Sequence, residues 1–109
     1  MIKVTLLYPA TPTCRFDHDY YERVHIPLAL ELLGSAVTSV MVERGISPGP
    51  PWPPAPYSTI CSFIVETREA YERALFPNAH RLQADVVNFS SEAALIQFSE
   101  VTLERSISR

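Results

Sequence analysis

Two histidines, two tyrosines and three acids fall within twelve consecutive residues, Phe16–Pro27. Within this segment Tyr21 and His25 are four residues apart, so a helix would place them on the same face. An imidazole can accept or release a proton near neutral pH, and a phenol one turn away can orient or polarise an oxygen of a bound molecule. The pair therefore indicates proton transfer, with His25 as general acid or base. The alternative is structural: His25 is then a core histidine bonded to the backbone around Pro27, and Tyr21 contributes only apolar area.

His18 lies at the edge of the same helical face and extends the group of candidate residues. We expect no metal site here, because the spacing of His18 and His25 separates them by about 10 Å along a helix axis. Asp19 and Glu22 fall elsewhere on the helical wheel and are predicted to be solvated surface charges. Tyr20 also lies off this face. The chemistry therefore rests on the two residues of the central pair.

No nucleophile motif, glycine-rich phosphate loop or dinucleotide fingerprint occurs in the chain, which has only three glycines. We therefore expect no cofactor. A small apolar or aromatic, oxygenated ligand needs an apolar pocket with few polar groups. The candidates for binding it are Phe16, Trp52 and Phe63, together with His18, although such aromatics equally serve core or loop packing. His80 has no partner nearby in the sequence and is predicted to lie on the surface.

Length and composition limit the remaining possibilities. The 109 residues suffice for a single domain, residues 1–109, and the formal net charge is -3 without charge runs. We expect neither nucleic acid nor membrane as a partner, because there is no basic stripe and no long apolar run. With no leader pattern, a cytoplasmic location is predicted. Cys14 and Cys61 are far apart and are predicted to be free thiols.

The periodicity of apolar residues predicts six elements in the order β-α-β-β-α-β. This order is typical of an α+β, ferredoxin-like domain, in which two helices cover one face of a four-stranded antiparallel sheet. Pro27 is predicted to kink the first helix near His25, because it removes a backbone donor. Asp17 and Thr67 are the expected N-caps. The predicted strands cover 2–8, 37–44, 57–66 and 93–103, the helices cover 17–33 and 67–85 with a break at Phe76–Pro77, and a stiff proline-rich flap covers 45–56.

The third and fourth predicted strands carry apolar residues on both faces. Helices on one side of the sheet would leave the other side in water. We therefore expect a homodimer in which two sheets pack face to face about a twofold axis.

Four segments of the chain resemble the EthD family of small bacterial and fungal proteins. They are IKVTLLYP, RFDHDYYERVHIPLA, a proline-rich loop ending in APY, and DVVNFSSEAALIQFSEV. The most specific is the F-D-x-x-Y-Y-x-x-x-H-x-P pattern, which fits Phe16–Pro27 position by position. The resemblance implies a dimeric α+β barrel, and it places the family's motif histidine on His25 and its tyrosine pair on Tyr20 and Tyr21.

The chain departs from the family pattern in its second half. A histidine often follows the proline of the broken helix in the family, and a D-I-P-N-Y segment follows later, whereas this chain has Asn78 and D-V-V-N-F. Asn78 cannot act as an acid or base, so a mechanism with two histidines is not expected. Asp85 and Asn88 are interpreted as structural caps.

Relatives in this superfamily include cofactor-free monooxygenases, isomerases, cyclases and decarboxylase-like proteins, so the fold alone does not select a reaction. Our first hypothesis is a small cofactor-independent enzyme of the lyase, isomerase or cyclase type. It would transfer a proton through His25, with Tyr21 orienting an oxygen of an apolar substrate. The alternatives are a non-catalytic ligand-binding or accessory protein of an oxygenase or ether-degradation system, and a cofactor-free monooxygenase.

Overall fold

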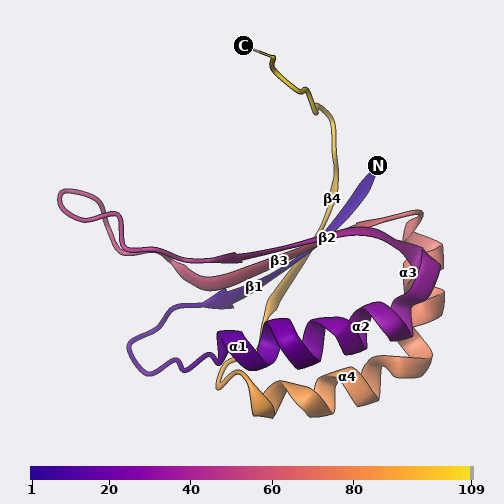
Figure 1. The fold of residues 1–109 in the computed structure, drawn as a ribbon, viewed down its shortest axis with the longest axis horizontal. Helices are drawn as coiled ribbons and strands as arrows, with labels where there is room; N and C mark the ends of the chain where they lie inside the picture. Colours follow the sequence, from indigo (N-terminus) through magenta and orange to yellow (C-terminus); the bar gives the residue numbers. More distant parts are fainter. Residues whose placement is uncertain (109) are drawn as a thin grey trace.

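A computed structural model describes residues 1–108 and has the predicted ferredoxin-like architecture (Figure 1). The four strands form one antiparallel sheet in the order β2-β3-β1-β4. All the helices lie on one side of this sheet. The elements are β1 (Ile2–Pro9), α1 (His18–Tyr20), α2 (Ile26–Leu33), β2 (Val37–Arg44), β3 (Tyr57–Val65), α3 (Arg68–Leu75), α4 (Ala79–Asp85) and β4 (Leu95–Glu100).

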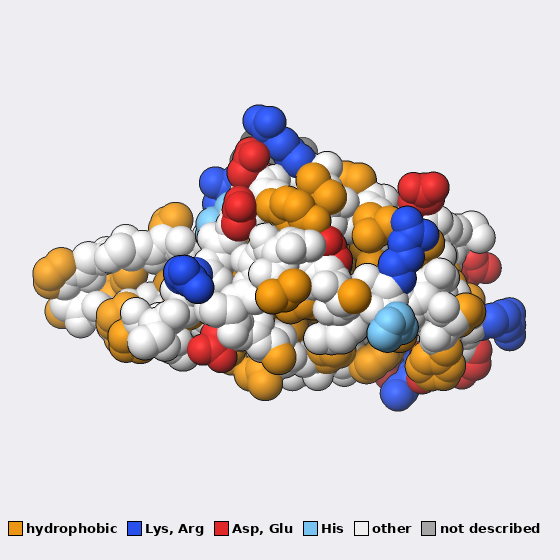
Figure 2. All heavy atoms as spheres, turned by 90° about the horizontal axis from the view of Figure 1, so that it is seen from below, with side chains coloured by type: hydrophobic (Ala, Val, Ile, Leu, Met, Phe, Trp, Pro, Cys, Tyr) orange, Lys and Arg blue, Asp and Glu red, His pale blue; other side chains and the backbone are white. Residues whose placement is uncertain are grey.

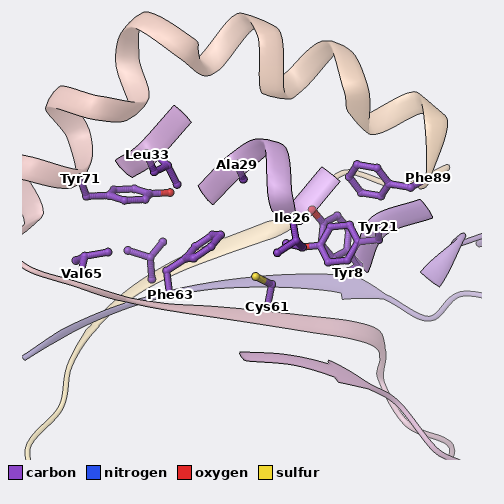
Figure 3. Close-up of a cluster of buried hydrophobic side chains, with 11 residues drawn as sticks. Tyr8, Tyr21, Ile26, Ala29, Leu33, Cys61, Phe63, Val65, Tyr71 and Phe89 are labelled. Carbon is purple, nitrogen blue, oxygen red and sulfur yellow. The ribbon is translucent and has the colours of Figure 1, made fainter. Parts of the chain in front are cut away.

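The core lies between the helices and the face of the sheet that they cover. Strands β1 and β3 are the central pair, and residues that face each other across them, such as Val4 and Phe63, point to the same side. Figure 3 shows the resulting cluster of side chains between sheet and helices. Its buried members are Val4, Tyr8, Tyr21, Ile26, Ala29, Leu33, Cys61, Phe63, Val65, Tyr71 and Phe89.

The first helix begins at the predicted cap, where the Asp17 carboxylate accepts a hydrogen bond from the backbone N–H of Tyr20 at 3.0 Å. Between α1 and α2 the chain makes a π-helical turn over Tyr21–His25, and the N–H of Ile26 bonds to the carbonyl of Tyr21, five residues earlier. Pro27 follows at once and lacks an N–H for the next bond. The predicted irregularity near His25 is thus present, and its form is a wide turn inserted into a helix.

The second helical segment is capped by Thr67, whose hydroxyl accepts from the N–H of Ala70 at 3.0 Å. As predicted, it is interrupted at Phe76–Asn78, which forms a 3₁₀ turn between α3 and α4. A further 3₁₀ turn, Val86–Asn88, follows α4. This second turn brings the chain back toward the start of the first helix, where the N–H of Asp17 bonds to the carbonyl of Phe89 at 2.7 Å.

Strand β4 is shorter than predicted. It covers Leu95–Glu100, whereas the apolar pattern predicted residues 93–103. The reason is that β4 pairs only with β1, and its last pair joins Glu100 to Ile2, next to the chain's first residue. Among residues 101–108, only the N–H of Val101 finds a backbone partner, the carbonyl of Met1.

The opposite face of the sheet carries no helix (Figure 1). The strand pairing places Leu7, Ile60 and Ile64 on this face near its centre, and Met41 and Leu95 toward its edges. Met41 and Leu95 are 62% and 56% exposed. Thr5, Ser62 and Gln97 share this face, so it is mixed and less apolar than the sequence predicted.

The proline-rich segment 45–56 extends the hairpin between β2 and β3 as an arm (Figures 1 and 2). Figure 2 shows hydrophobic side chains toward its tip. Ile46 and Trp52 in this segment are 80% and 68% exposed. The arm therefore adds little to the core of its own chain.

Replacing Phe89 by alanine should destabilise the fold by about 3–5 kcal/mol, because its buried ring packs on Tyr8, Phe16 and Tyr21 at centroid distances of 4.8–5.8 Å. Urea unfolding measures this free energy. Phe76→Ala is the matched control, since Phe76 is 66% exposed and its loss should change the free energy of unfolding by less than about 0.5 kcal/mol. Equal effects of the two substitutions would contradict the core described above.

Candidate active site

His25 is the last residue of the π-helical turn and is only 7% exposed. Its ring stacks on that of Tyr21, with centroids 5.5 Å apart and an interplanar angle of 15°. On another side the ring of Phe89 approaches to 4.4 Å. The imidazole is therefore held between two aromatic rings, which restricts its rotation.

The polar partner of His25 is Asp85, at the C-terminal end of α4. The Nδ1 atom of His25 lies 2.8 Å from Oδ2 of Asp85. The other carboxylate oxygen, Oδ1, accepts hydrogen bonds from the hydroxyl of Tyr20 at 2.6 Å and from the amide of Asn88 at 3.0 Å. The Asp85 carboxylate thus contacts three side chains, and it links the helical segment 18–33 to the segment 68–88.

This arrangement keeps Asp85 ionised. Burial alone would raise the pKa of its carboxyl, but hydrogen bonds from Tyr20, Asn88 and His25 outweigh burial and hold the pKa below its usual value. An ionised carboxylate is only an acceptor, so the Nδ1 of His25 must carry the proton that they share. In the neutral ring the lone pair is then on Nε2.

Within residues 1–108, the Nε2 atom of His25 has no hydrogen-bond partner. In the described part of the chain, no buried polar side-chain atom lacks a partner. Nε2 is therefore partly accessible to solvent, and His25 is one of the residues that line an apolar cavity. An Nε2 atom that faced this cavity would be in position to take a proton from a bound molecule.

The cavity lies between the helices and the sheet and has a volume of about 270 Å³. Figure 3 shows four of its side chains, Ala29, Leu33, Phe63 and Tyr71, around the space between these layers. Most of the lining is aliphatic or aromatic, and Gln83 of α4 contributes the one side-chain amide. The remaining lining residues are Leu6, Tyr8, Tyr21, His25, Ile26, Leu75, Ala79, Leu82, Val86, Ala93, Ala94 and Ile96.

Tyr21 is a neutral phenol at physiological pH. Its pKa is raised strongly, first by burial and then by the neighbouring Cys61 and Tyr8. Burial likewise raises the pKa of Tyr8 to about 12 and that of the Cys61 thiol to about 11. Both cysteines, Cys14 and Cys61, are free, as the sequence predicted. None of these buried groups supplies a base, so the titratable chemistry at the cavity rests on His25.

The predicted site residues fall into two groups. His25, Tyr21 and Phe63 line the cavity together. Phe16, His18 and Trp52 do not line it.

Phe16 packs against Tyr8 and Tyr21 at centroid distances of 5.0 Å. The Nδ1 atom of His18 lies 3.2 Å from the hydroxyl of Thr59, and burial, followed by the charge of Arg44, lowers its pKa. Trp52 lies on the exposed arm.

The prediction that Asp85 and Asn88 act as caps is wrong. Asp85 makes its hydrogen bonds to the side chains of His25, Tyr20 and Asn88, and none to a helix backbone. Tyr20, which lies off the predicted face, reaches the same carboxylate because it points from α1 toward the end of α4. The signal in the sequence was the spacing of Asp85 and Asn88, three residues apart at a helix end, which puts both side chains on one side.

Asp19 and Glu22 lie on the surface as predicted, where they pair with Arg23 and Arg44 at 2.9 Å. His80 is exposed, also as predicted.

Within residues 1–108, no three histidine, cysteine or acidic side chains are placed to share a metal ion. No helix in this part of the chain has the length and apolarity needed to cross a membrane.

Fold and site together define a small ferredoxin-like protein with an apolar cavity and a buried histidine–carboxylate pair. The EthD domain model matches residues 13–93, which include all the helices, β2, β3 and both residues of the pair. The chain therefore belongs to the EthD domain family. No functionally curated protein matches its sequence.

Solved structures agree with this assignment. An EthD-like protein from Ralstonia eutropha JMP134 is 35% identical, with a TM-score of 0.90 over 96% of this chain and 95% of that one. An ethyl tert-butyl ether D (EthD) family protein from Bacillus halodurans C-125 is 19% identical, with a TM-score of 0.69 over 94% and 99% of the two chains. A dimeric ferredoxin-like protein of unknown function from Thermobifida fusca YX is 10% identical, with a TM-score of 0.57 over 92% and 90%. At 19% and 10% identity, the proteins from Bacillus halodurans and Thermobifida fusca show similarity to this chain in fold alone.

The ionised state of Asp85 predicts how stability changes in acid. Because its folded pKa lies below the ordinary value of 3.8, its contribution to folding is complete above that value and is lost as pH falls through the folded pKa. In the Asp85→Asn variant this contribution is absent at every pH. Urea unfolding between about pH 6 and pH 2 should therefore give two stability curves that converge as the pH falls. Parallel curves would show that Asp85 is not held as a carboxylate by its neighbours.

Proposed function

We propose that the protein is a cofactor-independent enzyme that transfers a proton on a small, apolar, oxygenated molecule, as a lyase, isomerase or cyclase. The observation that carries this proposal is the Asp85–His25 pair, with Nδ1 and Oδ2 2.8 Å apart, in which His25 also lines an apolar cavity. A base oriented by a carboxylate behind it is the arrangement that general base catalysis uses.

In the proposed reaction, Nε2 of His25 takes a proton from an acidic O–H or C–H group of the bound molecule. The bonding electrons stay on the molecule as a phenolate or enolate, and the ring becomes an imidazolium. The Asp85 carboxylate at Nδ1 stabilises that cation. Returning the proton from Nε2 to another atom of the same molecule completes an isomerisation, and it leaves His25 ready for the next cycle.

The other residues around the pair have supporting roles in this proposal. Tyr21 is neutral and stacked on the imidazole, so its main task is to fix the plane of the ring beside the cavity. Tyr20 and Asn88 hold the Asp85 carboxylate by its far oxygen. These contacts would keep Nδ1 as the protonated nitrogen throughout the cycle.

A ligand-binding or accessory protein is the second candidate. It is favoured by the scarcity of polar groups in the cavity, where His25 and Gln83 stand among aliphatic and aromatic side chains. A cofactor-free monooxygenase would begin with the same proton removal, followed by reaction of the resulting anion with oxygen. Oxygen uptake would therefore separate it from an isomerase.

We also propose that the protein is a homodimer formed through the face of the sheet that carries no helix. Leu7, Ile60 and Ile64 lie near the centre of this face. The similarly folded protein from Thermobifida fusca is described as dimeric. Burial of these side chains against a second copy would remove them from water.

The proton-transfer proposal can be tested with 2-tetralone, an uncharged aryl ketone with acidic C–H groups. In D₂O the protein should accelerate exchange of these hydrogens, followed by NMR. His25→Gln should lower the protein-dependent rate by about 10²–10⁴-fold, since general base catalysis contributes that much. His80→Gln removes an exposed histidine and is the matched control, with an unchanged rate.

Tyr20→Phe should lower the same rate less than His25→Gln does, because it removes one of three donors to Asp85. If His25→Gln exchanged hydrogen as fast as the natural chain while it bound the ketone, the base assignment would be wrong. The ligand-binding function would be favoured if the natural chain bound the ketone without accelerating exchange.

The dimer proposal predicts a mass twice that of the 12.3 kDa chain in sedimentation at micromolar concentration. Met41→Glu places a charge on the uncovered face and should shift the mass toward that of a single chain. Val87→Glu changes a residue that is 81% exposed in the helical layer on the other side of the sheet, and it should leave the mass unchanged. A single-chain mass for the natural protein would refute this assembly.

A further inference from the structure

The apolar cavity that His25 lines contains no lysine or arginine among its lining residues. Among its residues, His25 is the only one whose side chain can carry a positive charge. That charge has a partner already, because Asp85 lies 2.8 Å from the Nδ1 atom. A negatively charged ligand would therefore find no cation of its own in the cavity.

The cost of binding an anion follows from this arrangement. A carboxylate or phosphate would leave water for an aliphatic and aromatic lining, and an unpaired buried charge is strongly disfavoured. It could approach a protonated His25, but Asp85 would then share the same cation, and the site as a whole would keep one negative charge. An uncharged O–H group avoids both costs, because it can donate a hydrogen bond to Nε2.

The volume of the cavity limits the size of the ligand. An apolar cavity of about 150 Å³ can hold benzene. The cavity here, at about 270 Å³, has room for one or two fused rings. The flat rings of Phe63 and Tyr71 are among its walls, and such side chains pack well on aromatic ligands.

We infer that the cavity selects an uncharged one- or two-ring aromatic molecule with a weakly acidic hydroxyl or an enolisable ketone, and that it rejects the corresponding carboxylates. This inference rests on the proposed function, since it takes Nε2 of His25 as the group that meets the acidic proton. The proton moves from the ligand to Nε2 and the electron pair stays on the ligand oxygen. The ligand thus becomes anionic only when the imidazolium forms beside it.

The test compares 2-naphthol with 2-naphthoate at about pH 7.5, where the phenol is neutral and the acid is ionised. Isothermal titration of the natural chain should give a dissociation constant at least ten-fold lower for 2-naphthol than for 2-naphthoate. Equal or tighter binding of 2-naphthoate, or binding of neither probe, would overturn the inference.

A charge-adding variant makes the test sharper. Gln83 lines the cavity and is also exposed, so an arginine at this position can be accommodated with its guanidinium at the edge of the cavity. Gln83→Arg should tighten 2-naphthoate binding and narrow or reverse the preference. If the preference stayed the same, the missing cation would not be its cause, and the inference would fail.

A second pair of variants checks that the probes bind in this cavity. Ala29→Leu fills space at a buried lining position and should weaken 2-naphthol binding at least ten-fold. Ala84→Leu adds the same side chain at an exposed position of α4 outside the lining and should leave binding unchanged. Thermal unfolding of both variants verifies that they are folded, and an equal affinity in the two would place the probe elsewhere.

The two proposals fail in different ways. If 2-naphthol is preferred but 2-tetralone is not exchanged faster by the protein, the ligand class stands and proton transfer is wrong. If exchange depends on His25 but 2-naphthoate binds as tightly as 2-naphthol, proton transfer stands and the charge selectivity is wrong.

Discussion

The contact between the Asp85 carboxylate and Nδ1 of His25 is the interaction on which the rest of the site depends. It joins residues that are 60 positions apart in the chain, one at the end of α4 and the other directly before α2. The two helical segments are thereby fixed relative to each other at one end of the cavity. Because the contact is largely buried, its electrostatic strength is greater than at the surface, and losing one partner would leave the other unsatisfied.

The backbone around His25 is shaped to serve this contact. The π-helical turn Tyr21–His25 ends where Pro27 removes a donor from the helix, so the extra residue and the missing hydrogen bond occur together. Such turns are found often at functional sites, because they change the direction of side chains within a helix. Here the turn directs Tyr21 and His25 to the same cavity and stacks their rings.

Local features of the structure could be predicted from the sequence. The strand 37–44, the caps Asp17 and Thr67 and the break at Phe76 each follow from residues next to one another in the chain, and all are present. The end of β4 could not be predicted in this way, because it is set by where its partner β1 begins. The length of a strand in a sheet depends on both strands that pair, and so it cannot be predicted from one of them alone.

The candidate site shows the same limit. His25, Tyr21 and Phe63 were predicted and lie at one cavity. The sequence predicts Asp85 as a cap, because an aspartate can accept a hydrogen bond from a free backbone N–H, but its actual partner comes from a distant segment. Periodicity tells which face of an element a residue occupies, but the element that packs against this face is determined by tertiary structure.

The central claim is that Asp85 fixes the tautomer of His25, with the proton on Nδ1 and the lone pair on Nε2. Nitrogen-15 NMR of the histidine rings, at a pH where the ring of His25 is neutral, measures this directly. We predict that Nδ1 of His25 gives the signal of a protonated nitrogen and Nε2 that of an unprotonated one, and that Asp85→Asn changes this pattern. A proton on Nε2 in the natural chain would contradict the account, since the nitrogen at the cavity would then have no lone pair to accept a proton.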